Sequence, residues 1–119
     1  MFTNKRVKGN IGEDIAIEYL EKNGYKIIDR NFSSRFGEID IIARKDYIVA
    51  FIEVKTRSSI KYGNPYEFVD KNKQRKIGKT ALYYIKINNL INTQFSFDIM
   101  EVFLKEQNKI NHIKDAFWI

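Results

Sequence analysis

Apolar and polar positions alternate with two different periods along the chain, and these periods predict its helices and strands. Residues 10–23 and 71–88 place apolar side chains at helical spacing. Segments rich in β-branched and aromatic residues predict the strands, which are 25–32, 95–104, 110–114 and a hairpin at 37–57. The predicted elements fill a chain of 119 residues, which is long enough for a single domain, 1–119, with one core.

The predicted helices carry capping signals at their ends. Asn10 can cap the first helix, and Glu13 three residues later completes a capping-box pattern, while Gly24 ends the helix. Pro65 belongs to a further helix-start signal and Asp70 can cap the helix anew, so that region holds one helix or two. Helical spacing also places Glu13 on the inward half of its helix, where it could reach the polar residues of the hairpin. The capping role and the inward role are compatible.

The predicted hairpin is unusual because ionisable residues interrupt its apolar pattern. They are Glu38, Asp40, Glu53 and Lys55. A turn at residues 45–46 would set Glu38 opposite Glu53 and Asp40 opposite Phe51. Because side chains alternate across a strand, the four ionisable groups and Phe51 would share one face. The other face would carry the apolar residues between them, which are Ile39, Ile41, Ile52 and Val54.

Carboxylates that lie side by side on a sheet repel one another, so this arrangement needs positive charge nearby. Lys55 supplies one positive charge, and a divalent metal ion is a candidate for the rest. Oxygen-only ligands suit Mg²⁺ or Mn²⁺ rather than zinc. The alternative is a purely structural salt bridge among Asp40, Glu53 and Lys55.

The second predicted helix opens the most basic part of the chain, since residues 71–97 contain no acid. Lys71, Arg75 and Lys79 recur at every fourth position and form one stripe, which phosphates would stabilise. The alternative is that this stripe is an ordinary solvated face. Gln74 lies on the inward side of the same helix, so its amide needs a partner, for which the carboxylates or a bound nucleotide are candidates.

Composition narrows the classes of partner and site. The net charge is +6 and the pI is about 9.5, which favours a polyanionic partner. The absence of cysteine fits a reducing compartment, and a single histidine, His112, argues against a structural zinc site. We expect His112 to be structural or solvent-facing, and Asp98 to lie either at the site or at an edge. The first ten residues lack the apolar core of a signal peptide, and the longest apolar run is 47–52, so we expect a cytoplasmic protein without a membrane span.

An aspartate on one strand followed by Glu-x-Lys on the next, here Asp40 and then residues 53–55, resembles the core motif of the PD-(D/E)XK nucleases. Further segments extend the resemblance over nearly the whole chain, and they are residues 9–13, 37–40, 51–57, 70–77, 97–98 and 115–117. Together they look like the YraN family, small bacterial proteins that are related to archaeal Holliday-junction resolvases and regarded as candidate endonucleases. This resemblance implies an α/β, restriction-endonuclease-like three-layer fold with a central mixed β-sheet flanked by helices.

Carried over position by position, the resemblance also implies roles for the candidate residues. Asp40 and Glu53 would bind the metal ion, with the carbonyl of Val54 as a further ligand. Lys55 would orient or deprotonate the attacking water, or neutralise charge at the phosphate. We favour the electrostatic role because the neighbouring acids hold its charge. Glu13 matches a helix glutamate that supports the metal site in resolvase-like members.

The remaining matches are looser. Glu38 lies near the expected site in a supporting position, and Gln74 stands where related nucleases often carry a glutamine. Ile39 occupies the place of the signature proline. This departure weakens the match to the motif more than it weakens the expected chemistry, because the proline is not one of the residues expected to bind the metal ion. Arg57 follows the second arm of the hairpin and is available, together with the stripe of the basic helix, to contact nucleic acid.

The leading hypothesis is therefore an Mg²⁺- or Mn²⁺-dependent endonuclease that hydrolyses DNA phosphodiester bonds, with branched DNA of repair or recombination as one candidate substrate. The first alternative is a nucleic-acid-binding module that keeps the nuclease fold but cuts little or not at all. A third hypothesis is an assembly protein whose basic helix docks an acidic partner. Resolvase-like relatives act as dimers, so a homodimer is a further expectation.

Overall fold

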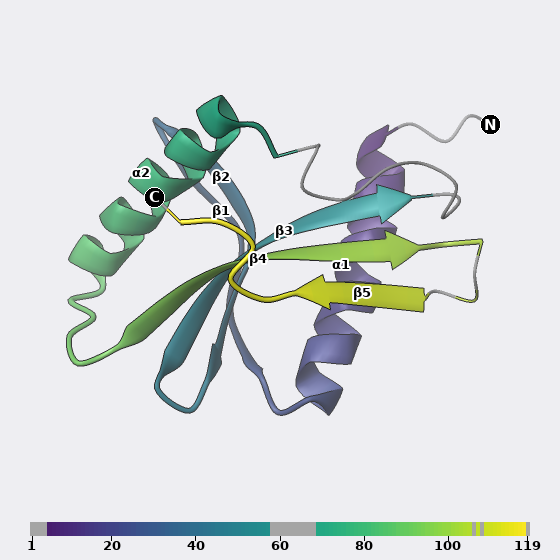
Figure 1. Ribbon diagram of the computed structural model, residues 1–119, viewed down its shortest axis with the longest axis horizontal. Helices are drawn as coiled ribbons and strands as arrows, with labels where there is room; N and C mark the ends of the chain where they lie inside the picture. Colours follow the sequence, from purple (N-terminus) through teal and green to yellow (C-terminus); the bar gives the residue numbers. More distant parts are fainter. Residues whose placement is uncertain (1–4, 58–68, 106, 108, 119) are drawn as a thin grey trace.

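The structure, a computed structural model, describes residues 5–57, 69–105, 107 and 109–118 (Figure 1). Its elements are α1 (Lys5–Lys22), β1 (Lys26–Ser34), β2 (Gly37–Lys45), β3 (Ile48–Arg57), α2 (Lys71–Ile87), β4 (Gln94–Phe103) and β5 (Lys109–Ile113). The predicted helices, hairpin and strands are confirmed, with boundaries that differ by a few residues in most cases. The helix-start signal at Pro65 lies outside the described residues.

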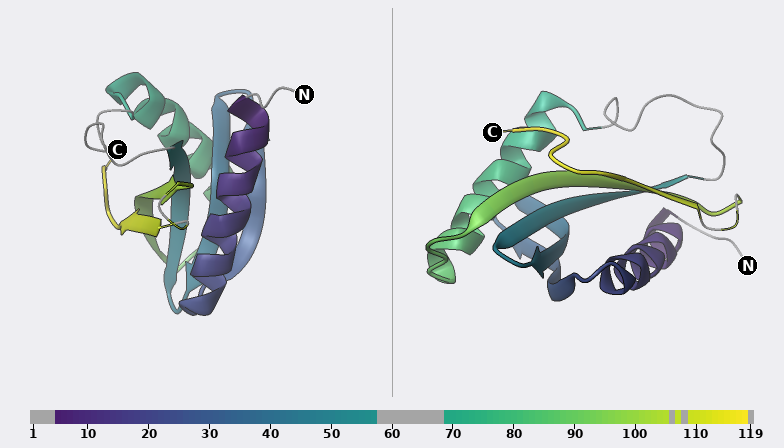
Figure 2. Two further views of the ribbon diagram at one scale, coloured as in Figure 1. Left: turned by 90° about the vertical axis from the view of Figure 1, so that its right-hand side faces the viewer. Right: turned by 60° about the horizontal axis from the view of Figure 1, so that its bottom comes forward.

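The five strands form one sheet in the order β1-β2-β3-β4-β5. Neighbouring strands are antiparallel except β3 and β4, which run parallel and therefore need a crossover connection, to which α2 belongs. Helix α1 covers one face of the sheet and α2 the other, as the two views of Figure 2 show. The expected three-layer α/β fold with a central mixed sheet is thus confirmed. In the described part of the chain, no helix is long and apolar enough to cross a membrane.

Each face of the sheet carries its own apolar cluster. On the α2 side, aromatic rings dominate, and Phe51 stacks on Phe97 with ring centroids 5.5 Å apart while Tyr84 of α2 meets Phe51 edge-on. On the α1 side, Ala16 and Leu20 pack on small and aliphatic residues of the sheet. Both faces of the central strands are therefore buried, which explains why β3 and β4 read as nearly continuous apolar runs.

The start of α1 differs from its prediction. The helix begins at Lys5, so Asn10 lies inside it and is not its cap; the Asn10 carbonyl accepts from Arg30 Nη2 at 3.3 Å. A capping box is a local signal, and it does not reveal whether a helix has already begun upstream. The end signals at Gly24 and Asp70 are confirmed. Gly24 follows α1 with φ +88°, and Asp70 caps α2 by accepting from the Lys73 N–H at 2.7 Å.

The register of the hairpin is also different from the predicted one. The turn is Asp46-Tyr47, with Lys45 paired to Ile48, so Ile42 rather than Asp40 lies opposite Phe51. The ladder between β2 and β3 ends at the pair Ile41–Ile52. The predicted pairing of β2 with β3 was therefore displaced by two residues along β2. The turn could not be located accurately from the sequence because no Asn-Gly or Asp-Gly pair marks it. An even displacement keeps every side chain on its predicted face, except where the strand itself is irregular.

One such irregularity occurs in β2. Ile39 packs in the cluster on the α2 side, whereas Ile41 packs on the α1 side. Residues two apart in a regular strand share a face, so the alternation breaks between them. On β1 the break falls at Asn31, which adopts φ 55° between the paired residues Arg30–Ile41 and Phe32–Ile39. The prediction that Ile39 shares a face with Ile41 was wrong, and the break falls at the position of Asp40.

Candidate metal centre

Asp40 and Glu53 come together just beyond the end of the β2–β3 ladder. The Val54 N–H, which has no partner in that ladder, donates to Asp40 Oδ2 at 2.8 Å. Burial raises the pKa of Asp40 to about 8, helped by repulsion from Glu53 and, more weakly, Glu13, although the Val54 N–H opposes the shift. Both side chains line the same cleft. The expected convergence of Asp40 and Glu53 on one face is therefore present.

Two lysines face this carboxylate pair. Lys73 Nζ of α2 lies 2.9 Å from Glu53 Oε1, and Lys55 Nζ lies 4.0 Å from the same oxygen. Burial lowers the pKa of Lys55, and the charge of Lys73 adds to this lowering. Burial acts most strongly on the pKa of Lys73 and lowers it, but the hydrogen bond to Glu53 and the charges of Glu53 and Asp40 together outweigh burial, so the net shift is upward.

Sequence reasoning missed Lys73 because the basic helix offers many similar side chains. A usable signal was present, since Lys73 stands four residues before the buried Ile77 and so shares its inward face. The stripe that was singled out instead consists of exposed residues, which are Lys71, Arg75 and Lys79.

An open cleft of about 300 Å³ lies over the carboxylate pair. Helix α2 forms one wall with Lys73, Lys76 and Ile77, and the two strands form the other with Glu38, Asp40 and Glu53, next to Gly37. The cleft therefore has acids on its sheet side and cations on its helix side. A phosphodiester could meet both at once.

Helix α1 contributes Glu13 to the same region from the opposite layer. At the preceding residue, Gly12, a Cβ atom would collide with Thr56 Oγ1, so only glycine lets α1 come this close to β3. Glu13 is buried and pairs with Arg30 Nε at 3.3 Å. With its amide oriented to satisfy both acceptors, Asn31 donates to Glu13 Oε1 at 3.3 Å and to Glu38 Oε1 at 3.1 Å. The break in β1 thus links Glu13 to Glu38.

Two of the candidate residues have other partners. The amide of Gln74 donates to the Val69 carbonyl at 2.9 Å and does not line the cleft. Arg57 forms an ion pair with Glu101, and both side chains are largely buried. The geometry therefore gives Gln74 a role in holding the segment before α2, and gives Arg57 a role inside the sheet.

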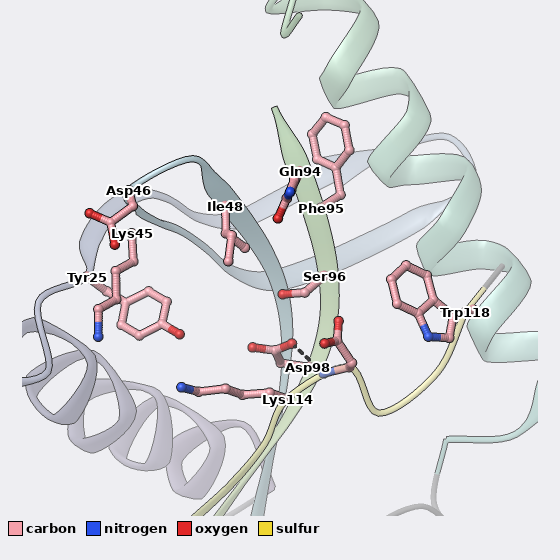
Figure 3. A pocket seen from close by; sticks show the side chains of 11 residues that line it. Tyr25, Lys45, Asp46, Ile48, Gln94, Phe95, Ser96, Asp98, Lys114 and Trp118 are labelled. Atoms are coloured by element: carbon pink, nitrogen blue, oxygen red, sulfur yellow. Dashed lines mark hydrogen bonds between the residues drawn. The ribbon is translucent and has the colours of Figure 1, made fainter. Parts of the chain in front are cut away.

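A hollow larger than this cleft lies elsewhere in the described part of the molecule and was not predicted. It measures about 530 Å³, and Figure 3 shows Asp98 at its centre with Tyr25 and Lys114 on one side and Trp118 on the other. Asp98 is buried and accepts from the Asp115 N–H at 3.1 Å, while its other oxygen lies 2.7 Å from His112 Nε2. Asp98 is thus not part of the carboxylate pair, and His112 is structural rather than solvent-facing.

The donor set of the cleft fits a hard divalent cation. Within the described residues, no group of three or more acidic, histidine or cysteine side chains could enclose a metal ion. Mg²⁺ does not require such a cage, since it is often held by one or two carboxylates and completes its shell with water and phosphate oxygens. Asp40 and Glu53 are such a pair, and their mutual repulsion raises the pKa of Asp40.

The sequence matches the family described as "Uncharacterised protein family UPF0102" over residues 12–102. A UPF0102 protein of Caldanaerobacter subterraneus subsp. tengcongensis is 48% identical over 118 residues, covering 96% of this chain and 97% of the relative. One from Clostridioides difficile is 48% identical and covers 96% of this chain and 99% of its own length, and one from Persephonella marina is 47% identical and covers 93% of each. The chain therefore belongs to the UPF0102 family, the YraN family that its motifs resemble.

Proposed function

We propose that the protein is a metal-dependent endonuclease that hydrolyses phosphodiester bonds of DNA. The observation that carries this proposal is the convergence of Asp40 and Glu53 in a cleft whose opposite wall is cationic. Placing two carboxylates together in a half-buried site costs free energy. A protein that only binds nucleic acid has no use for such a pair, whereas a hydrolytic metal site requires it.

Asp40 and Glu53 would hold Mg²⁺ or Mn²⁺, with the Val54 carbonyl as the further ligand that the family motif implies. When bound, such an ion lowers the pKa of a water molecule and offsets the negative charge of the phosphate. The N–H of Val54 orients Asp40 for this task by donating to Oδ2. Lys55 projects from the same face of β3 as Glu53, and its ammonium stabilises the charge that develops on the phosphate oxygens.

Burial lowers the pKa of Lys55, but the charges of Glu53 and Asp40 oppose this shift, so we retain the electrostatic role for its ammonium. Glu13 approaches the pair from the α1 side and adds negative charge near Asp40, while Glu38 lines the cleft beside the pair, and Asn31 joins these two glutamates. Gln74 holds the start of α2 through the Val69 carbonyl and thereby positions the cationic wall.

The nucleic acid would reach the cleft along α2. Lys71, Arg75 and Lys79 are exposed on this helix, and Lys76 lines the cleft itself. A chain with net charge +6 attracts a polyanion, and each phosphate contact adds to the salt dependence of binding. These contacts carry no sequence information, so we expect the enzyme to select its substrate by shape rather than by base sequence.

A binding module without cleavage is the second candidate. It is favoured by the ion pair between Lys73 and Glu53, which satisfies one carboxylate without a metal ion. On this alternative, Asp40 and Glu53 are structural and the cleft holds a phosphate only through its lysines.

A cleavage assay distinguishes the two candidates. The purified protein is incubated with Mg²⁺ or Mn²⁺ and with branched, flapped, single-stranded or linear DNA. Asp40→Asn is run beside the wild type at every step. We expect the wild type to cut at least one substrate, and Asp40→Asn to bind it without cutting, because the variant loses a metal ligand but no cation. Equal cleavage by both proteins would indicate a contaminating nuclease and refute the assigned site.

A further inference from the structure

The ion pair between Lys73 and Glu53 engages a carboxylate oxygen that could also serve as a metal ligand. Lys73 Nζ lies 2.9 Å from Glu53 Oε1, closer than Lys55 at 4.0 Å. The Glu53 side chain is only 7% exposed, whereas that of Lys73 is 41% exposed. The carboxylate is therefore fixed in the sheet, and the ammonium is the partner that can move.

An ammonium and a divalent cation compete for the same carboxylate oxygen. The two cations also repel each other, so binding of one at Glu53 Oε1 weakens the attraction of the other to that oxygen. Lysine has a long flexible stem, and its charge is readily rehydrated when it leaves a carboxylate. The Lys73 backbone is meanwhile held by Asp70, which accepts from its N–H at 2.7 Å. Displacement would thus swing the side chain and leave α2 in place.

The cleft provides a destination for the displaced ammonium. Lys73 and Lys76 both line it from α2, opposite the strands, and the cleft is open to solvent. A phosphate group that bridges the two walls would meet the carboxylate-bound cation on the sheet side and the freed ammonium on the helix side. Lysine serves such a phosphate as a point charge.

We propose that Lys73 is a built-in counter-ion of the metal site. With a divalent cation bound to Glu53, the Lys73 ammonium would leave this carboxylate and would bind a phosphate oxygen of the substrate. Metal and phosphate binding are thereby coupled, each favouring the other. This inference rests on the proposed metal site and assigns Lys73 as a substrate-binding residue whose contact with the phosphate depends on the bound metal ion.

Calorimetric titration with Mn²⁺, without nucleic acid, tests whether Lys73 and a divalent cation compete for Glu53. Lys73→Gln removes the competing charge, so we expect it to bind Mn²⁺ about tenfold more tightly than the wild type. Lys76→Gln is the matched control, because it removes the same charge from the same wall without touching Glu53; we expect a change of about twofold or less, by the general loss of charge. Lys73→Arg keeps the charge and should bind Mn²⁺ like the wild type.

A second experiment tests whether metal binding and phosphate binding are coupled through Lys73. The affinity for a fluorescein-labelled DNA oligonucleotide is measured by anisotropy with EDTA and with Ca²⁺, which replaces Mn²⁺ to avoid cleavage. We expect Ca²⁺ to increase the affinity of the wild type about tenfold more than that of Lys73→Gln. An equal increase in both proteins would refute the phosphate contact.

The outcomes separate this inference from the proposed function. If Lys73→Gln and the wild type bind Mn²⁺ equally while the wild type still cuts DNA, Lys73 is an ordinary structural partner and the nuclease assignment stands. If Lys73→Gln binds Mn²⁺ more tightly but no DNA substrate is cut, the counter-ion role is supported and the nuclease assignment fails. Thermal melting in EDTA confirms that each variant is folded.

Discussion

At the scale of single residues, the raised pKa of Asp40 lowers the stability of the folded protein. Its pKa is raised from 3.8 to about 8 by burial and by its acidic neighbours. Asp40 therefore binds its proton more tightly in the folded state than in the unfolded state. Between pH values of about 4 and about 8 the unfolded chain has lost this proton while the folded protein retains it, so the free energy of unfolding declines as the pH rises through this range. Residues held at a cost to stability are typical of functional sites.

We therefore predict that Asp40→Asn stabilises the metal-free protein at alkaline pH. Urea unfolding in EDTA should show a gain of about 1–3 kcal/mol at pH 8 and little difference near pH 4. Asparagine can still accept from the Val54 N–H, so that hydrogen bond is not lost. The same gain at both pH values would show that the charge of Asp40 is not the cause.

Gly12 is a second residue whose identity is set by its surroundings. We predict that Gly12→Ala lowers the free energy of unfolding by about 1–3 kcal/mol, since the added methyl group meets Thr56 Oγ1 in a packed interface. The double variant Gly12→Ala/Thr56→Ala should recover much of that loss, because it removes the colliding hydroxyl. A double variant no more stable than Gly12→Ala would contradict the steric explanation. Circular dichroism melts provide the measurement.

At the scale of elements, helix α2 has two functional faces. Its inward face carries Lys73 and Lys76 into the cleft, and its exposed side carries the basic stripe. The like charges of the stripe weaken the helix slightly, and phosphates would relieve them. Helix α2 therefore contributes the cationic wall of the cleft, and under the proposed function its exposed side would also bind the incoming nucleic acid.

This division leads to a prediction about Lys71 and Arg75. Lys71→Ala/Arg75→Ala should weaken DNA binding and reduce the slope of log K against log salt by about two, one unit for each lost phosphate contact. Lys22→Ala/Lys109→Ala removes the same charge from exposed positions at the end of α1 and the start of β5, and should change the slope little. If both pairs behave alike, the stripe is an ordinary solvated face.

The elements were predictable because their signals are local. Period-two and helical patterns identified every described helix and strand, and the odd separation of Asp40 and Glu53 across a two-residue turn placed them on one face. The pairing register was not predictable, since Asp46 adopts φ 55° in a turn without glycine. The break at Asn31 likewise depends on tertiary contacts that a strand pattern does not contain. Lys73 was indistinguishable in charge from its exposed neighbours.

At the scale of the whole molecule, the C-terminal segment closes the aromatic side of the core. Phe117 is 8% exposed, and its ring lies 5.4 Å from that of Phe97. The segment is further held by the Ala116 N–H, which donates to the Phe97 carbonyl at 2.7 Å. The last residues of the described chain are thus held on β4 and complete the apolar cluster on the α2 side of the sheet.

We predict that Phe117→Ala lowers the free energy of unfolding by about 3 kcal/mol, through lost burial and the cavity it leaves. Trp118→Ala is the matched control, because its side chain is 67% exposed, and it should change stability by about 0.5 kcal/mol or less. Urea unfolding followed by far-ultraviolet circular dichroism measures both. Equal effects would mean that the segment is not docked through Phe117.

The exposure of Trp118 has an optical consequence, because it is the single tryptophan of the chain. An indole that already faces water shifts its emission little on unfolding, so it is a weak indicator of denaturation. It borders the hollow of Figure 3 and shares no wall with the cleft over Asp40 and Glu53. A small molecule that enters the hollow should quench this emission, while occupancy of the cleft should leave it unchanged, so the two regions can be monitored separately in one sample.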